Sequence, residues 1–242
     1  GAECGNALHA IFELRKIGQP MAQQFDLIRR CLLDEGVRID AGALDATIAR
    51  IARRVQETLD APLLRGADPS PALARLPATH LRAEMEFNYA LGEVAMQRLR
   101  AACASHGEPD LVPRGSPQVL RGLMNGKIDL VFQHAGRFHV LDYKSNFLGE
   151  QLSAYAPDAL RAEMDRHDYR FQALLYSVAV DRYLRQRVPG YRRSDHLGAA
   201  IYLFVRAVGL APHSGIWAHR FDDALIVAVD DVLATAAHAE AA

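Results

Sequence analysis

The stretch Gly126-Lys-Ile-Asp-Leu-Val-Phe-Gln-His-Ala-Gly-Arg-Phe-His-Val-Leu-Asp-Tyr-Lys144 decides the fold of this chain. Two apolar, partly β-branched runs flank a short turn, and this pattern predicts a β-hairpin. If Ala135-Gly136 forms a two-residue turn, the pairing register places Asp129 directly opposite Asp142 on the neighbouring strand. The sequence therefore predicts two acidic side chains facing each other on one sheet surface.

Such a pair of carboxylates needs a positive charge nearby. Opposed residues have Cβ atoms roughly 4.5–5.5 Å apart, and like charges at that spacing are destabilising. Lys144 lies two residues beyond Asp142 and therefore projects from the same strand face. Two carboxylates and an ammonium can together hold a divalent metal and a phosphate, which is the arrangement of a metal-dependent nuclease. The alternative, a solvated strand face, is weakened because both strands are otherwise strongly apolar, so that charges there need partners.

Composition places the chain among soluble globular proteins of one large domain or two small ones. It has 242 residues, of which 50% are hydrophobic and 24% are charged. No apolar stretch approaches the ~20 residues of a membrane span, and no secretory signal opens the sequence. Three widely spaced cysteines, Cys4, Cys31 and Cys103, suggest a reducing compartment and cannot supply a four-cysteine iron–sulfur or zinc site. We therefore expect a cytoplasmic protein without a membrane partner.

Charge gives a mixed indication about nucleic acid. The formal net charge of −1 provides no global attraction for DNA. Between Arg161 and Arg193, however, eight arginines stand against four acidic residues. Such a basic strip could steer a phosphate backbone, but a solvated helix face explains the same charges equally well.

The periodicity of apolar residues predicts an α/β protein. Residues 1–60 have helical spacing throughout, and a second helix is expected from Glu93 to about Ala104. Residues 81–89 alternate and predict a strand with one buried face. The expected inward side chains are Leu81, Ala83, Met85, Phe87 and Tyr89, and the expected outward ones are Arg82, Glu84, Glu86 and Asn88.

Helical patterning returns from about Pro157 to Val188, with a break near His167-Asp168. The run Ala199–Val205 suits a strand buried on both faces. A short strand at 216–221 and a helix from Asp222 close the chain. The order predicts a mixed central sheet covered by helices, within a single domain. Its expected parts are a helical segment at 1–60, a core at 80–221 and a C-terminal helix at 222–242.

Four further polar residues could serve a site, although each has a simpler explanation. His9 lies on the first predicted helix, where a lone histidine is usually structural or exposed. Gln172 and Tyr176 are four residues apart and share one helix face, which packing alone would explain. Glu84 shares the polar face of its strand with Glu86, and either could be a base near a metal or merely hydrated.

As a set, these segments closely resemble the C-terminal nuclease domains of the RecB family, the β subunits of exonuclease V, within the PD-(D/E)xK nuclease superfamily. The resemblance extends over essentially the whole chain and is most specific in the hairpin. It is carried by Leu8-His-x-Ile-Phe-Glu13, Glu84-Met-Glu-Phe87, Arg121-Gly-x-x-x-Gly-x-Ile-Asp-Leu-Val-Phe132, Leu141-Asp-Tyr-Lys-Ser-Asn-x-Leu-Gly149, Gln172-x-x-x-Tyr176, Arg182-Tyr-Leu184 and Ile201-Tyr-Leu-Phe-x-Arg206.

The resemblance implies a restriction-endonuclease-like core and a role for each site residue. The metal ligands would be His9, Asp129, Asp142 and the main-chain carbonyl of Tyr143. Lys144 would orient or help deprotonate the attacking water and stabilise charge on the phosphate, so Asp129, Asp142 and Lys144 would be catalytic. The remaining expected roles are site framing and DNA contact for Gln172 and Tyr176, and a water-mediated metal contact for Glu84. Mg²⁺ suits the oxygen ligands, and a histidine ligand makes Mn²⁺ or Ca²⁺ compatible as well.

The resemblance therefore implies a Mg²⁺-dependent exodeoxyribonuclease domain of a RecB-like helicase–nuclease, which processes DNA ends in double-strand break repair and recombination. Its expected partners are single-stranded DNA delivered by a helicase motor, the RecB helicase region, and RecC- and RecD-like subunits. No motor or Gly-rich nucleotide loop precedes His9, so the chain resembles an excised domain. Two alternatives stay open: a non-catalytic DNA- or protein-binding module of the same fold, and a stand-alone PD-(D/E)xK exonuclease.

Overall fold

The computed structural model describes residues 2–115 and 119–238, so that 239–242 of the predicted C-terminal helix lie outside the described residues. Contacts divide the chain into two compact units. The first unit comprises Gly1–Glu84, Leu141–Leu160 and Ile201–Ala218, and the second comprises Met85–Val140, Arg161–Ala200 and His219–Ala242. The N-terminal helices and the end of the predicted hairpin thus belong to the first unit.

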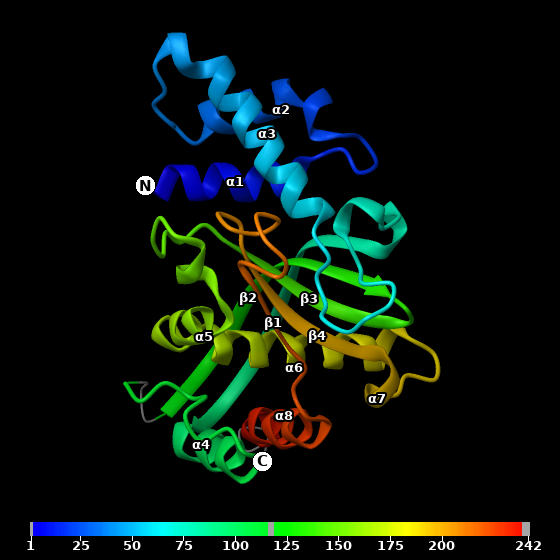
Figure 1. Cartoon of the computed structure of the whole chain (residues 1–242). Coiled ribbons are helices and arrows are strands. Elements are labelled where there is room, and N and C mark those ends of the chain that lie inside the picture. The colour runs from blue at the N-terminus through cyan, green and yellow to red at the C-terminus, as the bar shows by residue number, and fades with distance from the viewer. Residues whose placement is uncertain (1, 116–118, 239–242) are drawn as a thin grey trace. The chain divides into compact units, whose positions relative to one another are not determined.

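The predicted α/β class and the mixed central sheet are confirmed. Five strands are hydrogen-bonded in the order β1-β2-β3-β4-β5 (Figure 1). Strands β2 and β3 form a hairpin, whereas helices connect β3 to β4. The strands are β1 (Leu81–Ala95), β2 (Val119–His134), β3 (Arg137–Lys144), β4 (Leu197–Phe204) and β5 (Ile216–His219).

The β2–β3 turn has the two-residue form that the sequence predicted. Ala135 and Gly136 have φ values of 47° and 78°, and positive φ at both central residues matches the right-handed twist of a hairpin. Counting outward from this turn places Phe132 opposite His139, and their rings stack with centroids 4.9 Å apart. The predicted register is therefore confirmed in the part of the hairpin that belongs to the second unit.

The first unit contains the predicted N-terminal helices, drawn from blue to cyan in Figure 1. They are α1 (Ala2–Leu14), α2 (Phe25–Asp34) and α3 (Leu44–Asp60), and α2 contacts both of the others. Ile11 and Phe12 on α1, Ile28 on α2 and Val55 on α3 are buried. Their helical spacing places them on one face of each helix, which is why this segment forms a helical layer.

The second unit holds a helical layer of its own. Helix α8 (Asp223–His238) contacts α4 (Met96–Ser105) and α6 (Tyr169–Arg187). The predicted break near His167-Asp168 is confirmed, because α5 (Pro157–Arg166) ends there and Asp168 adopts a left-handed φ of 55°. A short α7 (Arg193–His196) precedes β4. Within the described ranges, each helix is too short or too polar to cross a membrane.

Two local predictions on β1 were wrong. The helix expected from Glu93 begins at Met96, because β1 remains extended to Ala95 beside β2. The alternation expected from residue 81 holds only from residue 85, since Ala83 is exposed and Leu81 is half-buried. Glu84 has a left-handed φ of 54°, which interrupts the two-residue period of the strand. The expected inward position of Tyr89 falls outside the side chains that the structure describes.

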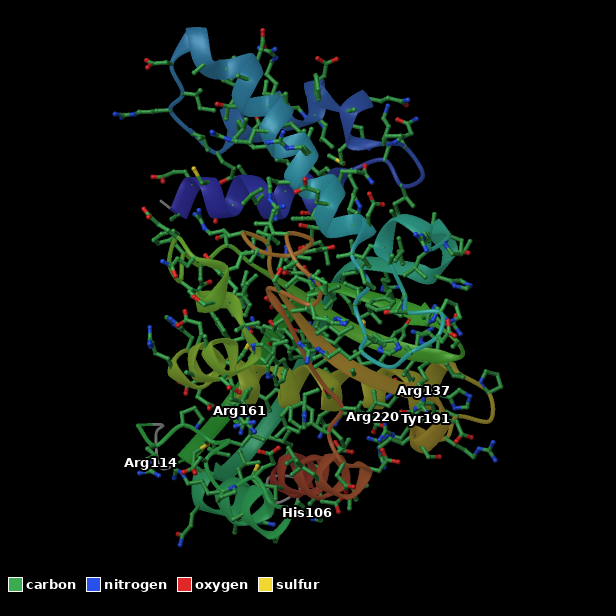
Figure 2. All side chains as sticks on the ribbon, in the orientation of Figure 1. His106, Arg114, Arg137, Arg161, Tyr191 and Arg220 are labelled. Atoms are coloured by element: carbon green, nitrogen blue, oxygen red, sulfur yellow. The ribbon has the colours of Figure 1, made fainter. Side chains whose placement is uncertain are left out.

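The arginine-rich segment is largely neutralised by ion pairs. Asp181 is fully buried and binds Arg185, Arg193 and the hydroxyl of Tyr191. Figure 2 labels Tyr191 beside Arg137 and Arg220 near α7, and both of these arginines donate to the carbonyl of Leu197. Seven of the eight arginines pair with acids: Arg161, Arg166, Arg170, Arg182, Arg185, Arg192 and Arg193. The strip is mainly structural and offers less charge to DNA than its sequence suggested.

Candidate active site at the end of β3

The carboxylate and the ammonium predicted to share a strand face form a close pair. Asp142 and Lys144 are separated by one residue on β3, so both side chains project from the same side. Nζ of Lys144 lies 2.6 Å from Oδ2 of Asp142, and their side chains are 14% and 5% exposed. A buried charge pair costs desolvation, so a fold retains it mainly where the charges are used.

The backbone at the end of β3 is fixed by the segment that follows β4. The N–H of Val205 donates to the carbonyl of Lys144 at 3.0 Å, and Nε of Arg206 donates to the carbonyl of Ser145 at 2.8 Å. Nζ of Lys144 also lies 5.2 Å from the ring centroid of Tyr202. All of these residues belong to the first unit. The position of Lys144 is therefore fixed by the hydrogen bond to its backbone carbonyl and by the Tyr202 ring near its ammonium.

Helix α1 brings His9 to the same strand. The ring of Phe12 stacks on Tyr143 with centroids 4.0 Å apart, and the ring of His9 meets Tyr143 edge-on at 6.3 Å. The helix packs closely here, since a Cβ added at Gly5 would lie 2.8 Å from Oγ of Ser145. His9 thus lies beside the residue that follows Asp142, although more than 130 positions separate them in the sequence.

The second unit positions the other predicted residues around Asp129, which is half-buried on β2. Gln172 and Tyr176 share one face of α6, where Nε2 of Gln172 donates to the hydroxyl of Tyr176 at 3.0 Å. That hydroxyl donates to the carbonyl of Lys127 at 3.0 Å, two residues before Asp129. The expected framing pair is therefore attached directly to the strand that carries the aspartate.

Sequence reasoning missed the packing that supports this attachment. The ring of Phe87 meets Tyr176 edge-on with centroids 5.7 Å apart. A Cβ built on Gly126 would lie 2.3 Å from Cζ of Phe87, so only glycine lets the ring lie there. The sequence did offer one signal, a glycine inside an apolar strand, which often marks a place where another group packs closely against the backbone.

The predicted metal ligands are shared between the two units, with His9, Asp142 and Tyr143 in the first and Asp129 in the second. Across residues 2–115 and 119–238, no group of three or more His, Cys, Asp or Glu side chains lies close enough to hold a metal ion. By its chemistry the donor set fits a hard divalent ion, because it offers carboxylate and carbonyl oxygens and one imidazole. Glu84, the weakest candidate, is half-buried at the left-handed position on β1.

The first unit also contains a largely apolar cavity of about 510 Å³. Ala7, Leu8 and Ile11 on α1 and Val55 on α3 line it together with other apolar side chains. Neither Asp142 nor Lys144 is among its lining residues. The cavity is therefore separate from the pair of Asp142 and Lys144 at the end of β3.

Three known proteins with similar sequences carry the same description. The chain is 33% identical over 240 residues to RecBCD enzyme subunit RecB of Escherichia coli K12, covering 97% of the chain and 19% of that relative. It is 30% identical over 262 residues to RecBCD enzyme subunit RecB of Mycobacterium tuberculosis H37Rv, covering 96% of the chain and 24% of that relative. The corresponding subunit of Haemophilus influenzae is 42% identical over 113 residues, which is 47% of the chain and 9% of the relative.

The chain spans about a fifth of the length of the first of these relatives, 19% in the Escherichia coli protein. The model of the PD-(D/E)XK nuclease superfamily matches residues 1–239, a range that includes the first unit, most of the second and every predicted site residue. The acid-x-lysine pair at the end of β3 is the feature that the superfamily name describes. On this match the chain belongs to the PD-(D/E)XK nuclease superfamily.

Proposed function

We propose that this chain is a Mg²⁺-dependent exodeoxyribonuclease domain that hydrolyses phosphodiester bonds with Asp129, Asp142 and Lys144. The observation that carries the proposal is the buried pair of Asp142 and Lys144, 2.6 Å apart. The register predicted from the two-residue turn would put Asp129 opposite Asp142 on β2. Two carboxylates and one ammonium are then available to a single phosphate.

His9, Asp129, Asp142 and the carbonyl of Tyr143 would hold the metal ion. The position of His9 beside Tyr143 supports this assignment, because α1 brings the imidazole to the strand that carries Asp142 and Tyr143. A bound divalent ion polarises the phosphoryl group and lowers the pKa of its coordinated water. Mn²⁺ or Ca²⁺ could occupy the same donors. Glu84 would contact the ion through water.

The residues of the chain would complete the reaction by positioning. Nζ of Lys144 would donate to the attacking water or to a phosphate oxygen, and its pair with Asp142 fixes the direction from which it donates. Gln172 and Tyr176 would frame the site and contact DNA, since Tyr176 is tied to the strand of Asp129 through the Lys127 carbonyl. Both units would act as one nuclease domain, which agrees with a family match over residues 1–239.

The biological setting belongs to the proposal as well. The similarity to RecB subunits supports DNA end processing in double-strand break repair and recombination, with single strands delivered by a helicase motor. The partners would be a RecB-type helicase region and RecC- and RecD-like subunits. Three cysteines without disulfides favour the reducing conditions of the cytoplasm.

A cleavage assay tests the proposal. Labelled single-stranded DNA is incubated with the 242-residue chain in Mg²⁺ or in a chelator, and the parent motor is added if the chain alone is inert. Cleavage should require Mg²⁺ and should be lost in Asp142→Asn. Asp110→Asn is a matched control, because Asp110 is exposed and pairs with exposed Arg114 on the surface. Absence of Mg²⁺-dependent cutting even with the motor would favour the non-catalytic binding module.

A further inference from the structure

Phe147 is unusually exposed for an aromatic residue so close to the proposed active site. It lies three residues after Lys144, in the segment that leaves β3, and 62% of its surface is exposed. A large apolar ring in contact with water loses the stabilisation that burial would provide. Single exposed apolar residues are common, so exposure alone does not indicate a binding site. The surroundings of this ring carry the argument further.

The backbone on both sides of Phe147 is held in place. The carbonyl of Ser145 accepts a hydrogen bond from Nε of Arg206 at 2.8 Å. The N–H of Leu148 donates to the hydroxyl of Tyr155 at 3.1 Å, and Tyr155 is buried. In Figure 1 this segment, which follows β3, and the orange segment after β4 lie side by side within the first unit. The backbone that carries the ring is thus held by specific hydrogen bonds on both sides.

A guanidinium lies over the same ring. Cζ of Arg206 is 5.6 Å from the ring centroid of Phe147, within the range of a cation–π contact. Arg206 is itself exposed. An exposed aromatic face beside an arginine is the combination on which proteins stack the bases of single-stranded nucleic acid.

We propose that Phe147 and Arg206 form a base-stacking subsite for single-stranded DNA, which positions the strand for cleavage beside Lys144. This inference rests on the proposed function. Three residues span at most about 10 Å, so a base on Phe147 keeps its neighbouring phosphates within reach of Lys144. Because every base has a π-face, the subsite accepts any sequence. The ligand is therefore a nucleobase of an unpaired strand, and a base-paired duplex, whose bases are stacked on each other, binds it poorly.

Binding of a fluorescent oligothymidylate in the presence of a chelator tests the subsite without cleavage. Phe147→Ala should weaken binding by about 5- to 150-fold, the range expected for loss of one stacked base. The matched control is Phe25→Ala, which removes another exposed phenylalanine (41%) of the first unit and should bind as wild type. An oligonucleotide without bases should bind wild type and Phe147→Ala equally, because only phosphate contacts remain. Equal affinity of wild type and Phe147→Ala for oligothymidylate would overturn the proposal.

A second variant keeps the test independent of any effect of the alanine on folding. In Phe147→Trp the new indole should be quenched when single-stranded DNA is added, after subtraction of the Trp217 signal of wild type. An unquenched indole at saturating DNA, or a wild type without measurable affinity for single strands, would also overturn the subsite. The outcome that contradicts the proposed function but not the subsite is distinct. In that case DNA binds and Phe147→Ala weakens the binding, but no Mg²⁺-dependent cleavage is observed.

Discussion

Nζ of Lys144 lies 2.6 Å from Oδ2 of Asp142 at the end of β3, where little of either side chain is exposed to solvent. The pair sets an ammonium against a carboxylate in an otherwise apolar strand, where an unpaired charge would be costly. Under the proposed function, the lysine would have two separable roles, one in the charge balance of the folded protein and one in chemistry. A single substitution can distinguish them by different measurements.

Lys144→Ala should reduce cleavage by two or more orders of magnitude while metal affinity stays nearly unchanged. An ammonium is not a metal ligand, whereas its loss removes transition-state stabilisation on the order of 3 kcal/mol or more. DNA affinity should fall only modestly, because one phosphate contact among several is lost. Single-turnover cleavage of single-stranded DNA at saturating Mg²⁺ measures the effect. Lys16→Ala removes an exposed charge elsewhere and should cut normally. A Lys144→Ala variant that cuts as fast as wild type would contradict a catalytic role.

The hairpin could be predicted because its information is local. A two-residue turn with glycine at its second position fixes the register, and the period of two then puts Asp142 and Lys144 on one face. The left-handed conformation of Glu84 could not be predicted in this way, because glutamate has no intrinsic preference for it. The altered exposure of the first residues of β1 follows from that one conformation.

The charge count of the arginine-rich segment did not reveal its neutralisation for a different reason. The acids that neutralise the arginine-rich segment include Glu108 and Asp230, which are distant in sequence and meet Arg170 and Arg182 only through the fold. A count of charges within the segment cannot include such partners. The same limit applies to the ring of Phe12 on Tyr143, because helical spacing predicts a helix at this position but not which strand the ring covers.

Gly126→Ala should destabilise the protein and disturb the framing pair. The added Cβ would lie 2.3 Å from the ring of Phe87, which must move away from Tyr176. Overpacking of this kind costs about 1–3 kcal/mol of unfolding free energy. Urea unfolding measures the loss, and cleavage of the folded variant should fall because Tyr176 contacts the strand of Asp129. Gly42→Ala, with no atom within 4 Å of the added Cβ, is the control. Equal loss in both variants would argue against the specific contact.

His139 should make stability depend on pH. It is buried, and Nδ1 accepts the N–H of Ala199 at 3.1 Å. Burial, with smaller contributions from His134 and Arg137, lowers its pKa from 6.5 to about 4. Between these values the unfolded chain binds a proton that the folded protein does not, so this contribution is complete above about pH 6.5 and is lost as the pH falls toward 4.

The full contribution of His139 to the free energy of unfolding is about 3 kcal/mol, because each pKa unit corresponds to 1.36 kcal/mol. Urea unfolding at pH 7.5, 5.5 and 4.5 measures it. His139→Gln cannot titrate and can still accept the Ala199 N–H, so its stability should change less over this range. His80→Gln, at an exposed position, should retain the wild-type slope. If the unfolding free energy of His139→Gln changes with pH as steeply as that of wild type, other groups cause the pH dependence.

Metal binding should raise the melting temperature if the proposed ligands form one site. The register predicted from the sequence would oppose Asp129 and Asp142, so a divalent ion would relieve their repulsion in the folded state and would find no equivalent site in the unfolded chain. Binding stabilises the native state by RT ln(1 + [L]/Kd), about 2.7 kcal/mol at a hundredfold excess over Kd. Thermal melting in Mg²⁺ or Ca²⁺ should therefore exceed melting in a chelator.

The same experiment with variants identifies the ligands. Asp142→Asn should melt at nearly the same temperature with and without metal, because one ligand and half of the repulsion are lost together. Asp110→Asn, which changes an exposed acid in an ion pair with Arg114, should keep the full metal-dependent difference. His9→Ala should reduce the difference more for Mn²⁺ than for Mg²⁺, since imidazole nitrogen suits the softer transition metal. If wild type melts at one temperature under saturating metal and chelator alike, the ligand assignment of His9, Asp129 and Asp142 is wrong, whatever the cleavage assay shows.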